Sequence, residues 1–283
     1  MKFTITRTIK AQQRLSRSIL TGEKKIAIVP TMGYLHDGHL SLIRRGLKEA
    51  DVVVTTIFVN PAQFAPNEDY TRYPRDTRGD LKKIRAAGGQ IVFMPQAAEM
   101  YPDNFQTYVN VEKLTTMLEG EVRPGHFKGV ATVVAKLFNI VQPDIALFGM
   151  KDFQQAMVLR RMTLDLNWPI KYIICPTARE KDGLAMSSRN SYLSPDQRRE
   201  AMALYKALLA AKKLAQSGQQ EVAPIMFEMR RVISQTAPSG RIDYIAFTEM
   251  ETLQPVTQIV KNTVISLAVR LGPVRLIDNL KIS

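Results

Sequence analysis

Residues 25–59, KIAIVPTMGYLHDGHLSLIRRGLKEADVVVTTIFV, place two short apolar runs on either side of a segment with helical spacing. The first run covers residues 25–30, and apolar residues then recur every three or four positions from Leu40 to Leu47. The second run, residues 51–59, is β-branched almost throughout, as a strand buried on both faces should be. This order predicts a strand, a helix and a second strand parallel to the first.

The same alternation continues on both sides of this unit. We expect a first surface helix from Thr8 to Leu20, ended by Gly22. Further helices are predicted at residues 77–87, 130–142 and 151–166, and further strands at residues 90–95, 107–111, 144–149 and 170–176. Strands that alternate with helices predict an α/β domain over residues 1–176, with a Rossmann-like, doubly wound, mainly parallel sheet.

The pattern changes after about residue 176. Two long helical segments, residues 195–216 and 219–235, follow a polar loop, and the first has Ser194 as its N-cap and Pro195 at its first position. Three strand-like segments then follow at residues 241–250, 263–272 and 274–282. They predict a short antiparallel sheet within a smaller C-terminal α+β domain, residues 177–283.

Composition narrows the class of protein. The chain has 283 residues and a net charge of +13, from 39 basic and 26 acidic residues. The basic residues are scattered in pairs and triples, which favours solvated helix faces or a small polyanion such as a nucleoside triphosphate over a nucleic-acid footprint. No stretch of about 18 uncharged apolar residues and no secretory signal is apparent, so we expect a cytoplasmic protein. The single cysteine, Cys175, lies in an apolar run and is expected to be a buried thiol.

Polar motifs follow three of the predicted strands, and ligands of open α/β sheets bind beyond such strand ends. His36 and His39 lie between the first strand and its helix. A helix N-terminus favours phosphate, and imidazoles beside it can donate to phosphate oxygens. Two rival interpretations are local satisfaction of backbone groups and a metal site. The metal site is weaker because no third histidine or cysteine is near and Asp37 points elsewhere if the imidazoles share a face.

The two other motifs carry amides and charges. In NPAQF, Asn60 and Gln63 suit a substrate with hydroxyl and carboxylate groups, or they pin a proline turn. In GMKDFQQ, Lys151 can reach a phosphate, while Asp152 suits a ribose hydroxyl, a hydrated Mg²⁺ or only the helix dipole. Gln155 is expected on the same helix face as Asp152.

Two loops add donors. Ser187, Ser188 and Arg189 are consecutive in DGLAMSSRN and suit triphosphate oxygens, with an ordinary hydroxyl-capped turn as the alternative. His126 stands with Arg123 and Lys128 in RPGHFKG. This segment fits either a second anion-facing loop or a tight turn.

Together these motifs resemble a known family. A His-x-Gly-His after the first strand and a distant serine-rich basic loop are similar to the nucleotidyltransferase superfamily that includes class I aminoacyl-tRNA synthetases. More narrowly, PTMGYLHDGH, FVNPAQF, YPRD, LEGEVRPGHFKGV, KLFNIVQPD, KDFQQ, DGLAMSSRN and RLIDN resemble the pantothenate synthetase (pantoate:β-alanine ligase) family, in the family's order and over nearly the whole chain.

The resemblance implies a set of site residues. His39 would be the acid-like catalytic residue, with His36 as its phosphate-binding companion and Lys151 beside them. Pantoate would be held by Asn60, Gln63 and Gln155, with Gln63 also near β-alanine. The implied ATP site comprises Met32, Gly33, Tyr34, Leu35, His36, Asp37, Gly38, His39, Gly149, Met150, Lys151, Asp152, Ala178, Met186, Ser187, Ser188 and Arg189. Met150 and Ala178 differ from the residues common in the family, where position 150 is often acidic or polar and position 178 often valine.

The implied reaction is ATP-dependent condensation of (R)-pantoate with β-alanine through a pantoyl-adenylate, with release of AMP and diphosphate, on the way to coenzyme A. Mg²⁺, a homodimer and a C-terminal domain that closes over the ATP site are implied as well, with no nucleic-acid partner and no membrane. One alternative is another adenylyl- or cytidylyltransferase of the superfamily, which should need more Arg or Lys where this chain has amides. The other is a basic nucleic-acid-binding module, which predicts salt-sensitive binding without ATP turnover.

Overall fold

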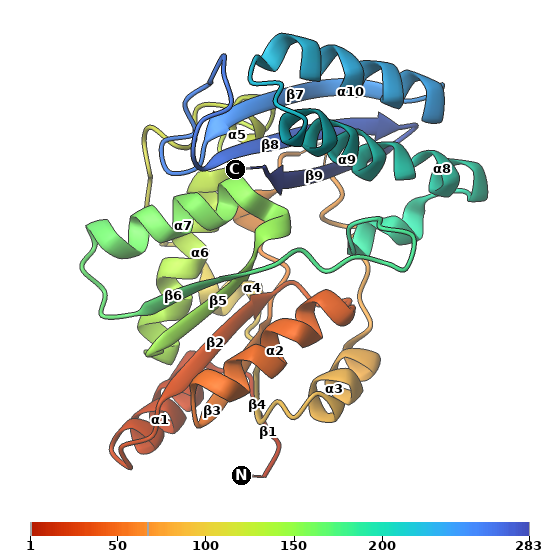
Figure 1. Cartoon of the computed structure of the whole chain (residues 1–283). Helices are drawn as coiled ribbons and strands as arrows, with labels where there is room; N and C mark the ends of the chain where they lie inside the picture. The colour runs from red at the N-terminus through yellow and green to blue at the C-terminus, as the bar shows by residue number, and fades with distance from the viewer. Residues whose placement is uncertain (1, 67, 283) are drawn as a thin grey trace. The chain divides into compact units, whose positions relative to one another are not determined.

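The computed structural model describes residues 2–66 and 68–282. The chain forms two compact units, which Figure 1 shows in ribbon form. Unit 1 comprises Met1–Gly149 and Val158–Pro176, and unit 2 comprises Met150–Met157 and Thr177–Ser283. The chain therefore passes into unit 2 directly after a strand, returns for the rest of one helix and a last strand, and then leaves again.

Within the described residues, unit 1 contains a six-stranded parallel sheet, which confirms the predicted α/β class. Its strand order is β1-β4-β3-β2-β5-β6. The strands are β1 (Thr4–Thr6), β2 (Ile26–Thr31), β3 (Val52–Ile57), β4 (Ile91–Phe93), β5 (Ile145–Gly149) and β6 (Lys171–Cys175). The order reverses between β2 and β5, and this switch point is where open parallel sheets bind ligands.

Helices cover both faces of this sheet because its central strands are apolar on both sides. Ile26 and Ile28 of β2 belong to the core under α1 (Ile9–Leu20) and α6 (His126–Val141). The alternate residues Ala27 and Val29 belong to the core under α2 (Asp37–Glu49) and α3 (Thr77–Ala86). Shorter helices are η1 (Pro61–Gln63), α4 (Ala97–Met100) and α5 (Glu119–Val122). Cys175 is buried as predicted, and burial raises the pKa of its thiol.

Two expectations for unit 1 are corrected. Strand β1, a three-residue strand at the sheet edge, was not predicted, because so short a run carries little alternation. Residues 107–111 do not form the predicted strand. The backbone N–H of Val109 donates to Thr132 Oγ1 of α6 at 3.0 Å, so this segment is attached to a helix and not to the sheet.

Unit 2 contains, within the part of the chain described, the predicted antiparallel sheet in the order β7-β8-β9. Its elements are η2 (Met150–Asp152), the start of α7 (Phe153–Asp165), η3 (Ser188–Tyr192), α8 (Pro195–Glu200), α9 (Met202–Gln216), α10 (Val222–Thr236), β7 (Arg241–Glu249), β8 (Thr263–Leu271) and β9 (Val274–Lys281). Ser194 caps α8 as predicted, in a capping box with Gln197. The single helix expected over residues 195–216 is divided at Ala201, which ends α8 and precedes α9.

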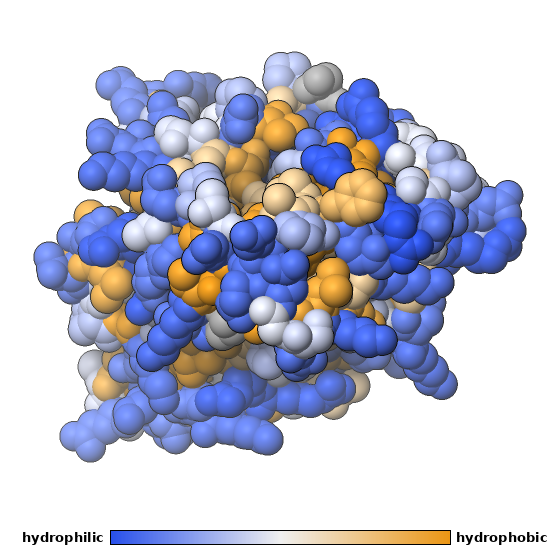
Figure 2. Space-filling model, turned by 45° about the horizontal axis from the view of Figure 1, so that its top comes forward, coloured by the Kyte–Doolittle hydropathy of each residue, from blue (hydrophilic) through white to orange (hydrophobic). Residues whose placement is uncertain are grey.

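Among residues 2–66 and 68–282, no helix is long and apolar enough to cross a membrane. On the face drawn in Figure 2, hydrophilic side chains predominate and apolar ones appear in separate patches.

Candidate active site

The loop between β2 and α2 is held in an unusual backbone conformation. Gly33 and Tyr34 have φ values of 84° and 51°, and the second is in the left-handed region that a non-glycine residue rarely adopts. The backbone N–H groups of Tyr34 and Leu35 both donate to the carboxylate of Asp80 in α3, at 2.8 and 2.7 Å. Asp80 thus fixes the turn that leads to the two histidines.

Asp80 is itself 1% exposed, and burial raises the pKa of its carboxyl, although the two backbone donors and Lys83 act in the opposite direction. Lys83, one turn further along α3, donates from Nζ to the carbonyl oxygen of Leu35 at 2.7 Å. Helix α3 therefore binds two backbone N–H groups of the loop, through Asp80, and the carbonyl of Leu35, through Lys83. Asp80 was not predicted from the sequence. The sequence feature that could have indicated its role is the place of this carboxylate four residues before Ile84, on the face of α3 that must be buried.

His36 and His39 form the first turn of α2. His36 is the N-cap residue, and its backbone N–H donates to Nδ1 of His39 at 3.3 Å. The two rings lie 4.1 Å apart between centroids, inclined by 43°. Because Nδ1 of His39 accepts, a neutral His39 carries its proton on Nε2, which is then a hydrogen-bond donor.

This arrangement favours an anion. The N-terminus of α2 presents backbone N–H groups and a partial positive charge, and the 13-residue length of the helix allows a developed dipole. Asp37, the first helical residue, is exposed. The described residues contain no group of three His, Cys, Asp or Glu side chains that could hold a metal ion.

The turn after β3 holds Asn60 and Gln63 together. The side-chain amide of Asn60 is saturated: its nitrogen donates to Gln63 Oε1 and to the carbonyl of Gly129, both at 3.1 Å, and its oxygen accepts from Ala62 N and the Tyr101 hydroxyl. Asn60 is 1% exposed. Asn60 therefore pins the proline turn, which is one of the two interpretations of this motif. Because it is buried and all its polar groups have partners, its side chain is held in place.

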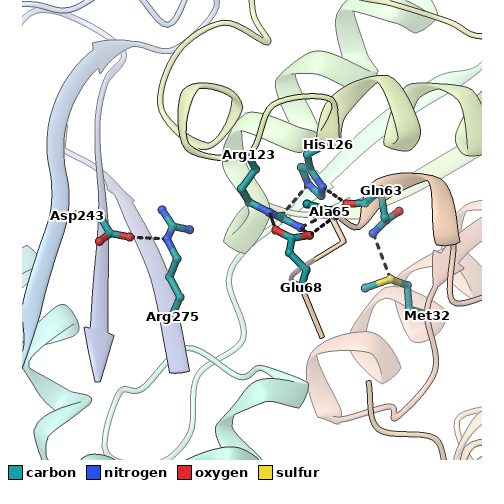
Figure 3. A network of polar contacts seen from close by, with 8 residues as sticks. All are labelled: Met32, Gln63, Ala65, Glu68, Arg123, His126, Asp243 and Arg275. Atoms are coloured by element: carbon teal, nitrogen blue, oxygen red, sulfur yellow. Dashed lines mark hydrogen bonds and ion pairs between the residues drawn. The ribbon is translucent and has the colours of Figure 1, made fainter. Parts of the chain in front are cut away.

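Gln63 is more exposed and less strongly bound. Its Nε2 donates to the thioether sulfur of Met32 at 3.2 Å, as Figure 3 shows. A thioether is a weak acceptor, so a substrate oxygen can replace it readily. This contact also connects the β2 loop with the β3 turn, two segments that follow neighbouring strands.

The start of α6 lies directly against this turn. A Cβ at Gly129 would lie 2.1 Å from the carbonyl oxygen of Ala62, so only glycine permits the approach. His126 is 9% exposed and its Nδ1 lies 2.9 Å from the carbonyl oxygen of Gln63. Residues 123–126 form a tight turn, one of the two interpretations that the sequence context suggested: His126 N donates to the carbonyl of Arg123 at 3.1 Å, and His126 then begins α6.

The predicted residues of unit 2 form a separate group. Lys151 and Asp152 lie in η2 and are paired at 3.3 Å between Nζ and Oδ1. Helix α7 begins only at Phe153, so Asp152 is in the preceding turn and Gln155 in the helix, which corrects the expectation of one helix from Lys151. The side-chain nitrogen of Asn279 in β9 donates to the carbonyls of Met150 and Lys151, at 2.9 and 2.8 Å.

The serine-rich loop is locally ordered. Ser187 is the N-cap of η3, and its hydroxyl accepts from the backbone N–H of Arg189 at 3.3 Å, as in the hydroxyl-capped turn. Met186 N donates to the carbonyl of Ala178 at 3.0 Å, so these two predicted ATP residues are adjacent. Arg179, next to Ala178, forms a bidentate pair with the buried carboxylate of Asp278.

The predicted site residues thus fall into two groups. In unit 1 the structure brings together Met32 to His39 with Asn60 and Gln63. In unit 2, Ala178 adjoins Met186, and Met150 to Asp152 are attached to β9. Asp80, His126 and Asn279, which hold these segments, were not predicted as site residues.

The sequence is similar to a known protein family over nearly its whole length. The family model described as Pantoate-beta-alanine ligase matches residues 4–281. A pantothenate synthetase from Geobacter sulfurreducens is 52% identical over 272 residues, 96% of each chain.

Solved structures of proteins with these two names are similar to this chain over nearly its whole length. The structure of pantothenate synthetase from Thermus thermophilus has a TM-score of 0.94 at 46% identity and covers 99% of both chains. The pantoate-beta-alanine ligase of Francisella tularensis, complexed with beta-gamma ATP and beta-alanine, has a TM-score of 0.81 at 33% identity. That alignment covers 99% of this chain and 97% of the Francisella chain.

Proposed function

The chain belongs to the pantoate-beta-alanine ligase family, and we propose how its residues carry out the reaction, which joins pantoate to β-alanine with consumption of ATP. A pantoate carboxylate oxygen attacks the α-phosphorus of ATP, the bond to the β-phosphate breaks, and diphosphate leaves. The β-alanine nitrogen then attacks the carbonyl carbon of the pantoyl-adenylate. The bond to AMP breaks, and the amine loses a proton.

The first step brings two anions together, so the protein must position the reactants and neutralise charge. We assign ATP to Met32–His39, where the α2 N-terminus offers N–H groups and His39 offers its Nε2 proton. His39 is the catalytic donor, and His36 binds phosphate beside it. Gly149 at the end of β5 and, from unit 2, Met150 to Asp152, Ala178 and Met186 to Arg189 contribute to nucleotide binding, with Lys151 as a point charge on phosphate.

The observation that carries this proposal is the contact between Gln63 Nε2 and Met32 Sδ at 3.2 Å. It attaches the turn assigned to pantoate to the loop assigned to ATP. Gln63 is uncharged, which suits the hydroxyl and carboxylate groups of pantoate and, in the second step, β-alanine. Gln155 is assigned to pantoate as well. Asn60 is assigned to pantoate only as the residue that holds Gln63, since its own amide is saturated.

Mg²⁺ fits this site as an ion that arrives with ATP. It prefers phosphate oxygens, water and one or two carboxylates over a cage of protein ligands, and Asp152 is an exposed carboxylate beside Lys151. When bound, the ion would neutralise phosphate charge. On the family resemblance we also propose a homodimer working in the cytoplasm, where ATP is regenerated. Sedimentation velocity tests the dimer directly.

The decisive experiment measures AMP formation with ATP, Mg²⁺, pantoate and β-alanine, and then with each substrate omitted. We expect diphosphate exchange into ATP to require pantoate and not β-alanine, and AMP release to require both. Exchange that ignores pantoate would overturn the assignment. Exchange that needs a phosphorylated acceptor would instead indicate a nucleotidyltransferase.

A further inference from the structure

The motif RPGHFKG has no role in the reaction described above, yet it contains a buried histidine, His126, that contacts the turn after β3. His126 begins α6, and both of its ring nitrogens have protein partners. Nδ1 faces the carbonyl oxygen of Gln63 at 2.9 Å, and Nε2 faces Arg123 Nη1 at 3.0 Å.

These partners fix the protonation of His126. A carbonyl can only accept, so Nδ1 carries a proton, and a guanidinium can only donate, so Nε2 has none. His126 is therefore the neutral Nδ1–H tautomer. Burial, together with the charge of Arg123, lowers the pKa of His126 to about 4. The imidazole is therefore neutral at neutral pH, and it serves as a fixed hydrogen-bond donor and not as an acid or base.

Arg123 is fixed in turn by Glu68. The Glu68 carboxylate accepts from Arg123 Nε at 2.6 Å and from Nη2 at 2.8 Å, a bidentate pair, and from the backbone N–H of Ala65 at 3.1 Å. Burial alone would raise the pKa of Glu68, but Arg123 and the backbone donor hold it below its ordinary value. The pair is thus charged at neutral pH.

The contacts form a closed ring around the turn that carries Gln63. They run from Ala65 N–H to Glu68, to Arg123, to His126 and back to the Gln63 carbonyl, and Figure 3 shows these side chains gathered around the turn. The backbone of Gln63 is held, while its side-chain amide binds, among the described residues, Asn60 and the weak acceptor Met32. The backbone of the turn is therefore fixed, while the side-chain amide of Gln63 can exchange its weak contact with Met32 for a substrate oxygen.

We propose that His126, with Arg123 and Glu68, is a positioning residue that sets the Gln63 amide for pantoate. This rests on the assignment of Gln63 to pantoate. None of the three needs to touch substrate. Without the donor at Nδ1, the partner of the Gln63 carbonyl among the described residues is Arg123 Nη2, at 3.5 Å, so the turn should shift.

The two nitrogens can be tested separately. In His126→Asn the amide overlays Nδ1 and can still donate to the Gln63 carbonyl, whereas in His126→Gln it overlays Nε2 and retains only the partner of Arg123. We expect His126→Gln to raise the pantoate KM about tenfold or more, with less than a twofold change in the ATP KM, and His126→Asn to change it less. A merely structural role would change both KM values together.

Gln63→Ala is the control for the underlying assignment. If it leaves the pantoate KM unchanged, the assignment of Gln63 itself is wrong. If Gln63→Ala raises the pantoate KM and folded His126→Gln does not, the positioning role is wrong. Arg123→Lys, which keeps the charge but loses the fork that joins Glu68 and His126, provides a second variant with the same expected direction.

A second, independent observation concerns RLIDN, residues 275–279, in β9. Arg275 pairs with Asp243 at 2.7 Å across the sheet (Figure 3) and Asp278 pairs with Arg179, whereas the side chain of Asn279 binds backbone carbonyls. Its two N–H donors go to the carbonyls of Met150 and Lys151, while its buried Oδ1 has no hydrogen-bond partner within residues 2–66 and 68–282. We infer that Asn279 is a positioning residue for Lys151 in ATP binding, which rests on the assignment of Lys151 to phosphate.

Asn279→Asp tests this inference because it replaces both donors by an oxygen that faces two carbonyls. We expect the ATP KM to rise about tenfold or more while the pantoate KM changes less than twofold, the reverse of His126→Gln. Ser266→Ala is the matched control, because Ser266 lies opposite Asn279 in the sheet and its buried hydroxyl has no hydrogen-bond partner in the part of the chain that the structure describes. An unchanged ATP KM in folded Asn279→Asp overturns the inference, provided that Lys151→Ala raises it. If Lys151→Ala does not, the assignment of Lys151 is wrong instead.

Discussion

The backbone N–H of His36 donates to Nδ1 of His39 at 3.3 Å, so α2 begins with a capping box built from imidazoles. This bond directs the proton of a neutral His39 to Nε2. We expect His39→Asn, whose amide overlays Nδ1, to keep the cap and lose the donor. Pantoate-dependent diphosphate exchange should fall by about 100-fold or more, as for loss of one donor at a developing charge, with the melting temperature little changed.

His39→Gln is a second test, because glutamine at this third helical position also caps a helix, as Gln197 does in α8. Its amide can also overlay Nε2, so it should retain more exchange activity than His39→Asn, with the melting temperature again little changed. If His39→Asn exchanges diphosphate as fast as the parent protein, His39 is only a capping residue and the catalytic donor must be sought elsewhere.

Asp80 is expected to control ATP binding without touching ATP. Asp80→Asn replaces one of two acceptor oxygens by a donor, so one of the backbone N–H groups of Tyr34 and Leu35 loses its partner. The ATP KM should rise about tenfold. Asp76→Asn is the matched control, because it makes the same change at the N-cap of α3, where asparagine caps as well. Equal effects of the two variants would contradict the role of Asp80.

The sequence predicted most of the fold because its signals are local. The alternation of apolar runs in β2 and β3, the spacing in α2 and the Ser194 cap all lie within a few residues. Strand β1 and the segment 107–111 depend on distant partners, Ile91 to Phe93 in one case and Thr132 in the other. No local pattern specifies such partners.

The same division applies to the site. His36, His39 and Gln63 could be proposed from their places at strand ends, because that position is itself a functional signal. Asp80 and His126 act on residues 45 and 63 positions away in the chain, and Asn279 on a turn 128 positions away. Residues that position other residues are recognised only from contacts.

His126 also predicts a pH dependence of stability. Its pKa is lowered from 6.5 to about 4 by burial, so the unfolded chain binds the proton more tightly than the native protein. The stability contribution is present above about pH 6.5 and is lost as the pH falls toward 4. Between pH 7 and pH 5, His126 should account for a loss of about 2 kcal/mol in the free energy of unfolding. Denaturant titrations of His126→Gln should show that much less loss over the same interval.

Gly129 should tolerate no side chain. A Cβ there would lie 2.1 Å from Ala62 O and 2.7 Å from Gln63 N, both backbone atoms, so η1 would have to move. We expect Gly129→Ala to lower the free energy of unfolding by about 3 kcal/mol and to raise the pantoate KM. Gly125→Ala is the control: Gly125 has φ of 81° but no atom near the added Cβ, so it should cost about 1–2 kcal/mol and leave the pantoate KM nearly unchanged.

The ion pair between Arg179 and Asp278 should be essential to unit 2. The side chain of Asp278 is 1% exposed, and Arg179 also donates to the carbonyl of Gly183 and stacks 4.1 Å from the Tyr205 ring centroid. Asp278→Asn leaves a guanidinium without its charge partner, which typically costs about 3–5 kcal/mol when the pair is buried. Since Arg179 is partly exposed, we expect about 2–3 kcal/mol in chemical denaturation. Glu228→Gln, which breaks the exposed pair with Arg231 on α10, should have no measurable effect, and equal losses for the two variants would show that the Asp278 pair contributes no more than a surface pair.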